Sequence, residues 1–379
     1  MRVLKFAQNL FLHVAPNNTA FCATLEGVLA AMGFQLEHQR RRRPSRSSSS
    51  SRSCTPVRGQ KRAREPTPEP VEVPFPEPPP RTRPSEHLRK CCPGCFGDLK
   101  YNPAEVADLM VCLDACFTEK KNKSHRDPPK FHPHSRFVPE SVARKTEEYV
   151  ESVRQQKKKT KRPKKNNGVV VDVEEDEDCY EHGLPLPCSV LDGCEASFKA
   201  ADEKREKAST DFFEDTALMA LLCRHDRVLF VVNMHSAGEK QFNVVALMET
   251  LFQHLPLNIR VGLLYDIACS FERSCRKWGF LSRFLERLAF AVSVFHAFGH
   301  EWACQLLYHP RKRIGFGFTN GEGCERFWHS ISHLIAHLRI CAYHNRLYTL
   351  DSQMEHAAEA SLTLKGLHYV HGWKMLEMR

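Results

Sequence analysis

The stretch IRVGLLYDIAC, from Ile259 to Cys269, is an apolar run that carries one acid, Asp266, near its C-terminal end. Continuous Val, Leu and Ile content is typical of a strand that is buried on both faces of a sheet. A carboxylate on such a strand costs free energy unless it is paired or binds a cation. The stretch therefore predicts a core strand and, at its end, a candidate metal ligand.

The segments before this stretch extend the pattern. Residues Leu109 to Phe117 form a second apolar run with one acid, Asp114, in its middle. The runs TALMALLC and RVLFVVNM, joined by CRHDR, predict a hairpin, and LPLPCSVLDGCEASFKAADEKREK before them predicts a turn and a charged amphipathic helix. The segment GEKQFNVVALMETLFQHLP predicts a helix that ends at Pro256.

The segments after the stretch complete an α/β pattern. We expect a helix from about Ser274 to Leu288 and a further strand in FAVSVFHAFGH. Strand, hairpin, helix, strand, helix and strand is the order of a mixed sheet flanked by helices. In such sheets ligands bind at the carboxyl ends of the strands, where Asp266 is expected.

The rest of the 379-residue chain is less uniform. Residues 1–38 predict a short helical segment, with Thr19 as its N-cap and Gly33 as its stop. Residues 39–86 are basic and rich in Ser and Pro, which predicts a disordered linker. The core is expected over residues 87–355, followed by a helical tail over residues 356–379. Within the core, residues 118–183 predict a largely disordered charged insertion with one helix at PESVARKTEEYVESVRQQ.

Composition excludes two classes of protein. The start, MRVLKFAQNLFLHVAP, is a poor secretory signal, so the sixteen cysteines indicate a reducing compartment and buried thiols or metal ligands rather than disulfides. No apolar run approaches the roughly 20 residues of a membrane helix, so no membrane partner is expected.

The formal net charge of +10 is concentrated in runs of basic residues. Such runs bind phosphate or act as nuclear-import signals, which predicts DNA as a partner and the nucleus as the location. Solvation of a disordered segment is an equally simple interpretation. The residues expected to contact DNA are Arg40, Arg41, Arg42, Arg43, Lys157, Lys158, Lys159, Lys161 and Arg162.

Two further acids, Glu322 and Glu325, lie at the start of the apolar helix expected in GFGFTNGEGCERFWHSISHLI. Capping and the helix dipole explain an acid there, at about 0.3–1 kcal/mol. A single Asp at a strand end is also a common turn former or ion-pair partner. Acids brought together from separate elements would instead repel one another unless a divalent cation neutralised them. Two Mg²⁺ ions held by such acids, about 3.5–4 Å apart, promote phosphodiester chemistry.

Several segments around these acids resemble the core of the Kyakuja-Dileera-Zisupton (KDZ) transposases of eukaryotic DNA transposons. They are CRHDRVLFVVNMHSAGEKQ, LLYDIACSFERS, VFHAFGHEWACQLLYHPRKRIGFGF, NGEGCERFWHSISHLI and LDSQME. The resemblance covers about Cys91 to Glu355 and appears again in APNNTAFCATLEGVLAAMG. It implies an α/β, RNase H-like mixed sheet flanked by helices, with a disordered N-terminal region and a long disordered insertion.

The resemblance also implies roles for the acids. Asp114 in VCLDACF and Asp266 in LLYDIAC become the first two ligands of two Mg²⁺ or Mn²⁺ ions, and a glutamate of GEGCER becomes the third. We prefer Glu325, because ERFW is similar to the glutamate motif of hAT-type transposases, and keep Glu322 as the alternate.

Cysteines and histidines indicate zinc. The CCPGC stretch supplies Cys92 and Cys95 in a CxxC pattern, which is half of a zinc site. The other half is open, with Cys91 or a distant residue as candidates. Cys112 and Cys116 would lie about 13 Å apart on one strand, too far to share an ion, so we expect them in the core.

A second group, His296, His300 and Cys304, recurs every four residues and resembles a Cys/His motif that follows the second acid in several transposase families. Zinc binding and packing beside the active site both remain open for it, and also for Cys223 and His225 in CRHD. We expect Trp302 and Trp328 to be core aromatics.

The leading hypothesis is therefore a cut-and-paste DNA transposase with a DDE acidic triad, which would self-associate if active. One alternative is a truncated or domesticated remnant that binds DNA or a partner without catalysis, since related transposases usually extend beyond both ends of this sequence. Another is a host nuclease of the same fold that does not join strands.

Overall fold

The computed structural model describes residues 2–15, 17–33, 75–124, 126–160, 178–181, 183–206 and 212–377. The chain divides into two compact units, residues 1–70 and 71–379. Described helices of the first unit are α1 (Arg2–His13) and α2 (Asn18–Ala31). The predicted cap of α2 was two residues off, because Asn17, not Thr19, caps it by accepting a hydrogen bond from the Ala20 N–H at 2.9 Å. The predicted stop at Gly33 has the expected left-handed backbone, with φ of 84°.

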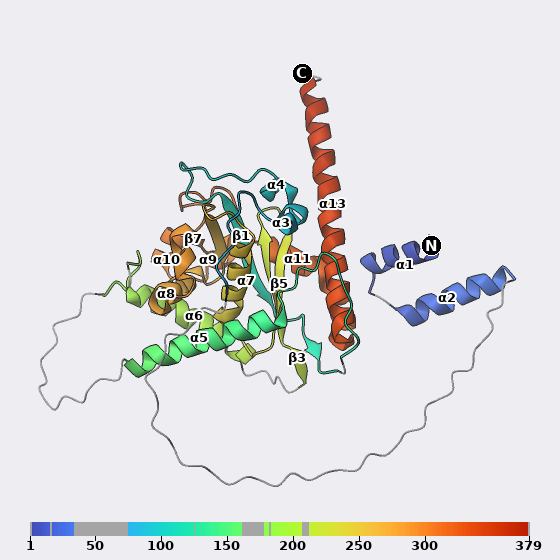
Figure 1. Cartoon of the computed structure of the whole chain (residues 1–379), viewed down its shortest axis with the longest axis horizontal. Coiled ribbons are helices and arrows are strands. Elements are labelled where there is room, and N and C mark those ends of the chain that lie inside the picture. The colour runs from blue at the N-terminus through green and yellow to red at the C-terminus, as the bar shows by residue number, and fades with distance from the viewer. Residues whose placement is uncertain are drawn as a thin grey trace, which may run out of the picture. The chain divides into compact units, whose positions relative to one another are not determined.

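A five-stranded mixed sheet lies at the centre of the second unit (Figure 1), in the order β5-β4-β1-β6-β7. The first three form an antiparallel meander, whereas β6 runs parallel to β1 and β7 parallel to β6. The predicted α/β class and the predicted hairpin are confirmed. The strands are β1 (Leu109–Cys116), β4 (Ala217–Cys223), β5 (Val228–Met234), β6 (Val261–Tyr265) and β7 (Leu288–Ala291).

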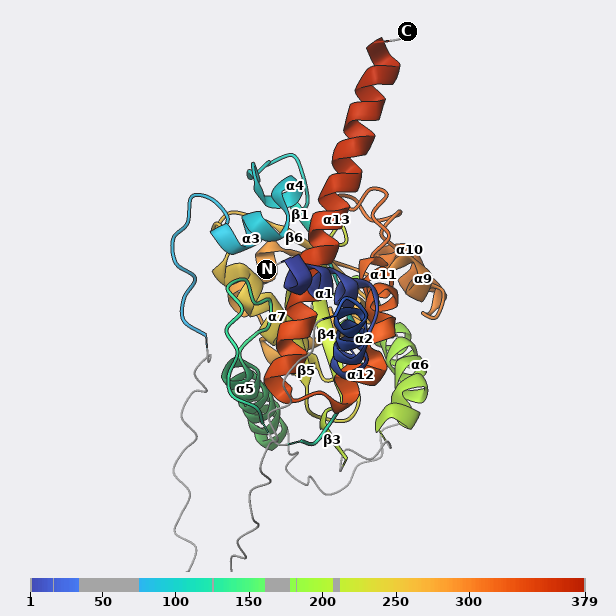
Figure 2. The same cartoon turned by 90° about the vertical axis from the view of Figure 1, so that its right-hand side faces the viewer.

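Alternate residues of β1 face two different hydrophobic cores. Leu109, Val111 and Leu113 pack with α7 (Gln241–Gln253), whereas Met110 and Cys112 pack with residues of α11 (Gly323–Ile331). Figure 2 shows α5 (Glu140–Thr160) and α7 on one side of the strands and α11 on the other. The helices therefore cover both faces of the sheet, as the continuous apolar runs predicted.

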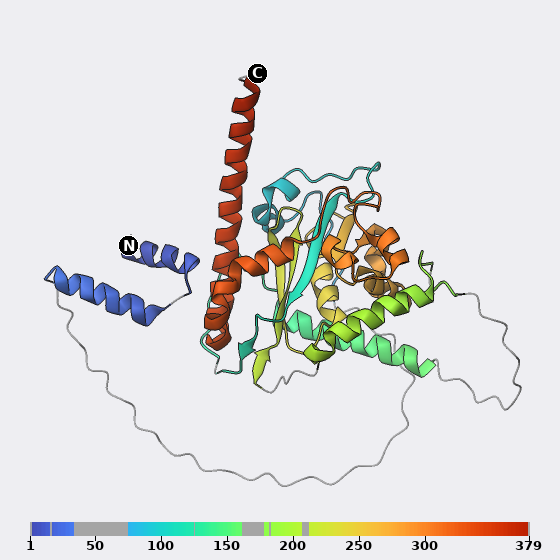
Figure 3. The same ribbon diagram turned by 180° about the vertical axis from the view of Figure 1, so that it is seen from behind.

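The remaining elements connect these layers. Helix α13 (Tyr343–Glu377) is one long helix, so the helix expected in the tail begins earlier than residue 356 (Figure 3). A small second sheet pairs β2 (Lys121–Asn122) with β3 (Phe213–Asp215). The other helices are α3 (Glu86–Cys91), α4 (Pro93–Phe96), α6 (Cys188–Glu206), α8 (Ala268–Trp278), α9 (Val294–Ala297), α10 (Trp302–Tyr308) and α12 (Ile335–Ile340), with short 3-10 helices at Ser282–Arg287 and Ser332–Leu334.

The helix predicted from Ser274 to Leu288 was wrong. Helix α8 begins at Ala268, immediately after the second acid, and ends at Gly279, whose φ is 80°. A glycine in the left-handed conformation ends a helix because it satisfies the last carbonyls without steric strain. A 3-10 turn then leads into β7.

Parts of the predicted disordered segments pack against the core. Residues 118–160 include the buried side chains of Lys121, Arg136 and Val150. In the predicted linker, the Ser85 N–H donates to the main-chain oxygen of His254 at 2.9 Å. These anchors are mostly polar, so an apolar pattern could not reveal them. The parts of those predictions that fall on residues 39–74, 125, 161–177 and 182 lie outside the described residues.

Candidate active site and two Cys/His clusters

The two aspartates lie at the same level of neighbouring parallel strands. Leu113 of β1 pairs with Tyr265, the last residue of β6, so the next residues are Asp114, still within β1, and Asp266, the first residue after β6. Neighbouring strands lie about 4.8 Å apart, which brings these two residues side by side. The Trp328 Nε1–H donates to Asp114 Oδ2 at 2.8 Å. Trp328 is buried, as predicted, and its ring also orients the first acid.

Asp266 lies among other carboxylates. Burial raises the pKa of Asp266 well above its usual range, and the charges of four acids raise it further: Asp114, Glu239, Glu322 and Glu325. Like charges favour the protonated form of a buried acid, and a bound cation would reverse that preference. Asp114 and both candidate glutamates therefore lie close enough to Asp266 for their charges to act on it; together with Glu239, these residues are here called the acidic group.

Glu322 does not cap the helix that it precedes. Its side chain makes no capping hydrogen bond to α11, and its Oε1 accepts the Phe295 N–H at 2.8 Å instead. Glu325 lies in the first turn of α11, where the helix dipole favours negative charge. A capping hydrogen bond therefore does not explain the presence of an acid at position 322, whereas the helix dipole stabilises the negative charge of Glu325.

Two further side chains lie near Asp266: His296, for which packing beside the active site was one of the two roles left open, and Glu239, which was not foreseen. The His296 Nδ1 lies 3.1 Å from Asp266 Oδ2, so His296 faces the carboxylates and not the Cys/His group of His300 and Cys304. Glu239, in the turn before α7, accepts a hydrogen bond from the Tyr265 hydroxyl at 2.6 Å. A turn residue such as Glu239 has no periodicity that would single it out in the sequence.

The carboxylates are less tightly grouped than the thiols. In the described part of the chain, three or more potential ligand atoms come within 4.8 Å of one another only in two Cys/His clusters. The carboxylates around Asp266 therefore lie farther apart than the ligand atoms of these two clusters.

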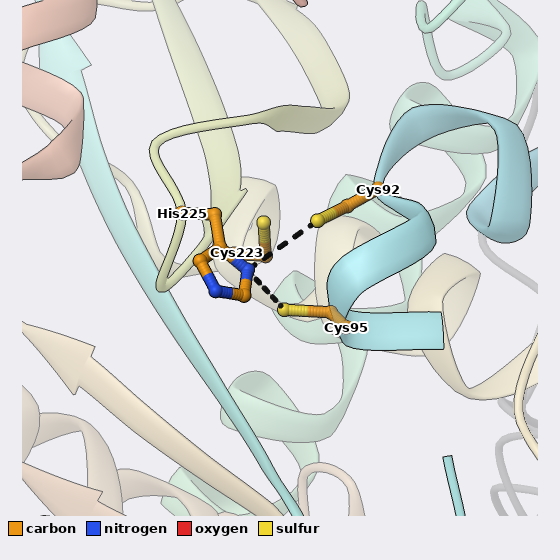
Figure 4. A group of neighbouring side chains, drawn as sticks. All are labelled: Cys92, Cys95, Cys223 and His225. Carbon is orange, nitrogen blue, oxygen red and sulfur yellow. Dashed lines mark hydrogen bonds between the residues drawn. The ribbon is translucent and has the colours of Figure 1, made fainter. Parts of the chain in front are cut away.

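The first cluster, here called the hairpin cluster, comprises Cys92, Cys95, Cys223 and His225 (Figure 4). Cys92 directly precedes α4 and Cys95 lies within it, whereas Cys223 ends β4 and His225 lies in the turn that leads to β5. The His225 Nδ1 lies 3.5 Å from Cys92 Sγ and 3.1 Å from Cys95 Sγ. The partners of the CxxC pair are thus distant in sequence, and Cys91, which lies beside His87 instead, is not one of them.

The second cluster, here called the acid-side cluster, comprises Cys194, Cys269, His300 and Cys304. The His300 Nδ1 lies 3.4 Å from Cys269 Sγ and 3.5 Å from Cys304 Sγ. The sequence pattern found only His300 and Cys304. Cys194 and Cys269 lie on separate helices, α6 and α8, and carried no spacing signal.

One thiol in each cluster has an unusual acidity. A hydrogen bond from Cys223 is the largest effect that lowers the pKa of Cys92, and a hydrogen bond from Cys269 does the same for Cys194. Three cysteines and one histidine form a ligand set typical of structural zinc. Both clusters could therefore hold a metal ion such as zinc.

Other predicted residues lie elsewhere. Cys112 is buried, with its Sγ 3.9 Å from that of Cys324, as expected for a core cysteine. The prediction of a buried Trp302 was wrong, since this residue is 68% exposed. Arg40 to Arg43, Lys161 and Arg162 lie outside the described residues, and Lys157 to Lys159 belong to the last turn of α5. No described helix is long and apolar enough to cross a membrane.

The family model for the Kyakuja-Dileera-Zisupton transposase matches residues 107–357. This range includes all five carboxylates of the acidic group and the acid-side cluster, whereas Cys92 and Cys95 precede it. No curated protein and no solved structure matches the chain.

Proposed function

Because the chain belongs to the Kyakuja-Dileera-Zisupton transposase family, which implies DNA binding, we propose that it cleaves and joins DNA strands at a DDE acidic triad on an RNase H-like sheet. The observation that carries the proposal is the register of β1 and β6, which aligns Asp114 with Asp266 at one end of the sheet. Ligand sites of open α/β sheets lie at such carboxyl ends.

The proposed ligands of two Mg²⁺ or Mn²⁺ ions are Asp114, Asp266 and Glu325. Burial and the charges of the neighbouring acids raise the pKa of Asp266, and a bound cation would restore its ionised form, which supports a cation at this place. Oxygen ligands suit both metals. Bound there, the ions would supply Lewis-acid activation of the attacking oxygen and stabilisation of the leaving oxygen.

The protein's own side chains orient these ligands. Trp328 donates to Asp114, and His296 lies against Asp266. Glu322 already accepts the Phe295 N–H with one carboxylate oxygen, although it raises the pKa of Asp266 more than Glu325 does. We keep Glu325 as the proposed third acid because ERFW is similar to the hAT-type glutamate motif, with Glu322 as the alternate.

We also propose that both Cys/His clusters bind zinc. A tetrahedral zinc site with bonds of about 2.3 Å to sulfur and 2.0–2.1 Å to nitrogen has sulfur and nitrogen atoms roughly 3.6 Å apart. The sulfur–nitrogen distances in the two clusters, between 3.1 and 3.5 Å, are close to that value. We further propose that the basic runs bind DNA phosphates in the nucleus. We also propose that an active chain assembles with further copies of itself.

A cleavage assay tests the proposal. The zinc-loaded chain is incubated with end-labelled duplex DNA and Mg²⁺ or Mn²⁺, beside Asp266→Ala and the surface control Asp98→Ala, whose carboxylate is 83% exposed. We expect nicking by the wild-type chain and the control, and none by Asp266→Ala. Binding without nicking by the wild-type chain would contradict the enzymatic proposal. Nicking without any joined product would favour the host-nuclease alternative.

A further inference from the structure

The segment that joins β4 to β5 contributes to the hairpin cluster and also contacts helix α11. Cys223 and His225 belong to the hairpin cluster, and the next residue, Asp226, faces the glutamate helix α11. There the Arg326 guanidinium donates two hydrogen bonds to Asp226, each 2.7 Å long. Arg326 directly follows Glu325, so a single ion pair links the turn to the third acid of the proposed triad.

The turn holds a backbone conformation that it would not adopt freely. Asp226 has φ of 59°, and the other described non-glycine residue with positive φ is Leu281. The Asp226 N–H donates to the main-chain oxygen of Cys223 at 2.9 Å, which closes the turn. Such conformations persist where the surroundings hold the residue from several sides. The ligands on one side and Arg326 on the other provide two such anchors.

The glutamate helix approaches this turn closely. A Cβ atom at Gly323, the first residue of α11, would lie 2.8 Å from Asp226 Oδ1 and 3.0 Å from Cys112 Sγ. Only glycine allows that approach without a shift of the neighbouring atoms. The helix start, and with it Glu325, is therefore placed by the position of Asp226.

We propose that a zinc ion in the hairpin cluster positions the third acid, by fixing Asp226 so that it holds Arg326 and the start of α11. The zinc ion is structural, and Asp226 and Arg326 act as positioning residues. The inference rests on the proposed function for the role of Glu325. Two of the four ligands, Cys92 and Cys95, precede the range that the family model matches.

Two substitutions separately interrupt the proposed link between the zinc ion of the hairpin cluster and Glu325. Cys95→Ser removes a ligand, and Arg326→Met removes the ion pair while it keeps most of the apolar stem and all four ligands. His225→Cys exchanges one zinc ligand for another and serves as the conservative variant. Cys341→Ser, which alters a half-buried cysteine outside both clusters, is the matched control.

Two readouts are measured on the full chain without DNA: zinc content by mass spectrometry and the dissociation constant for Mn²⁺ by electron paramagnetic resonance. Residues that orient metal ligands typically change metal affinity about 10-fold to 100-fold. We expect Cys95→Ser to lose one zinc ion and to bind Mn²⁺ at least about 10-fold more weakly. Arg326→Met should keep its zinc and weaken Mn²⁺ binding by a similar factor, whereas His225→Cys and Cys341→Ser should retain both metals.

The double variant decides whether the effect follows the proposed route. If zinc acts through the ion pair, Cys95→Ser combined with Arg326→Met weakens Mn²⁺ binding no more than either change alone, because coupled residues are not additive. If the losses of Mn²⁺ affinity in the two single variants multiply in the double variant, the inference is overturned. An unchanged Mn²⁺ affinity in Arg326→Met would overturn it as well, and this test remains valid even if Cys95→Ser fails to fold. A wild-type chain that binds zinc but no Mn²⁺ would instead contradict the proposed function.

Discussion

The His300 Nε2 lies 2.7 Å from the main-chain oxygen of Asp266, while the Nδ1 of the same ring faces Cys269 and Cys304. A metal ion bound through Nδ1 leaves the proton on Nε2, so the ring donates to that oxygen. Metal-bound histidines commonly use their second nitrogen in this way, which fixes the tautomer and orientation of the ring. The acid-side cluster is thus tied to the backbone of Asp266, as the turn of the hairpin cluster is tied to α11 through Asp226 and Arg326.

The two clusters should bind zinc independently. They share no ligand, so Cys304→Ser and Cys95→Ser should each reduce the zinc content from two ions to one per chain. The double variant should contain none. Elemental analysis of the purified chains measures these ratios, and a wild-type chain with one zinc ion or none would contradict one or both assignments.

Replacement of Trp328 by Phe should weaken the acidic site. The change keeps a buried aromatic ring but removes the N–H that donates to Asp114. Loss of one partner of a buried polar group costs about 1–3 kcal/mol, and more for charged groups. Urea unfolding should therefore show a lower free energy of unfolding, and Mn²⁺ should bind more weakly. Trp278→Phe, at a half-buried ring away from the carboxylates, controls for the ring change.

Gly323→Ala should destabilise the fold and disturb the acidic site. The added methyl group would meet Asp226 Oδ1 at 2.8 Å and Cys112 Sγ at 3.0 Å. Overpacking of this kind typically costs about 1–3 kcal/mol. Gly299→Ala is the matched control, because its Cβ would meet its nearest neighbour at an ordinary 3.4 Å. Equal unfolding midpoints for the two variants would show that α11 is free to move.

Glu119 should make the stability depend on pH. Burial raises the pKa of its carboxyl to about 7, against the opposing charges of Arg346 and Arg339. Between pH 4.5 and about 7 the folded state therefore binds more protons than the unfolded state, so this group stabilises the fold at low pH and that contribution is lost as pH rises toward neutrality.

Glu119→Gln should remove this dependence, because a neutral amide carries no buried charge at any pH. The free energy of unfolding of the variant should exceed that of the wild-type chain by about 1–3 kcal/mol above pH 8 and approach it near pH 4.5. Urea titrations across this range measure the difference. A wild-type chain that gains stability between pH 5 and pH 8 relative to Glu119→Gln would contradict the assignment.

The sheet could be predicted because its strands are apolar along their whole length. The runs Leu109–Phe117 and Ile259–Cys269 identified β1 and β6, with Asp114 inside the first strand and Asp266 at the C-terminal end of the second. The helix after β6 was misplaced because Gly279, which ends α8, lies inside a segment of suitable helical periodicity. One left-handed glycine overrode that periodicity.

The candidate site was less accessible to sequence reasoning. The CxxC pair at Cys92 was recognised, but its partners Cys223 and His225 lie more than a hundred residues away in a turn. Spacing cannot reveal ligands that only the fold brings together. The same applies to Cys194, to Cys269 and to the polar anchors of residues 118–160, such as the buried Arg346 that donates to the main-chain oxygen of Glu119 at 2.9 Å.

Metal-dependent strand cleavage in a set of acid variants tests the central claim most directly. Initial rates are measured on labelled duplex DNA with Mn²⁺ for the wild-type chain, Asp114→Asn, Asp266→Asn, Glu325→Gln and Glu322→Gln, each with its zinc content verified. The account predicts cleavage by the wild-type chain and by Glu322→Gln, and loss of cleavage in the other three. Cleavage that persists in Asp114→Asn or Asp266→Asn would contradict it.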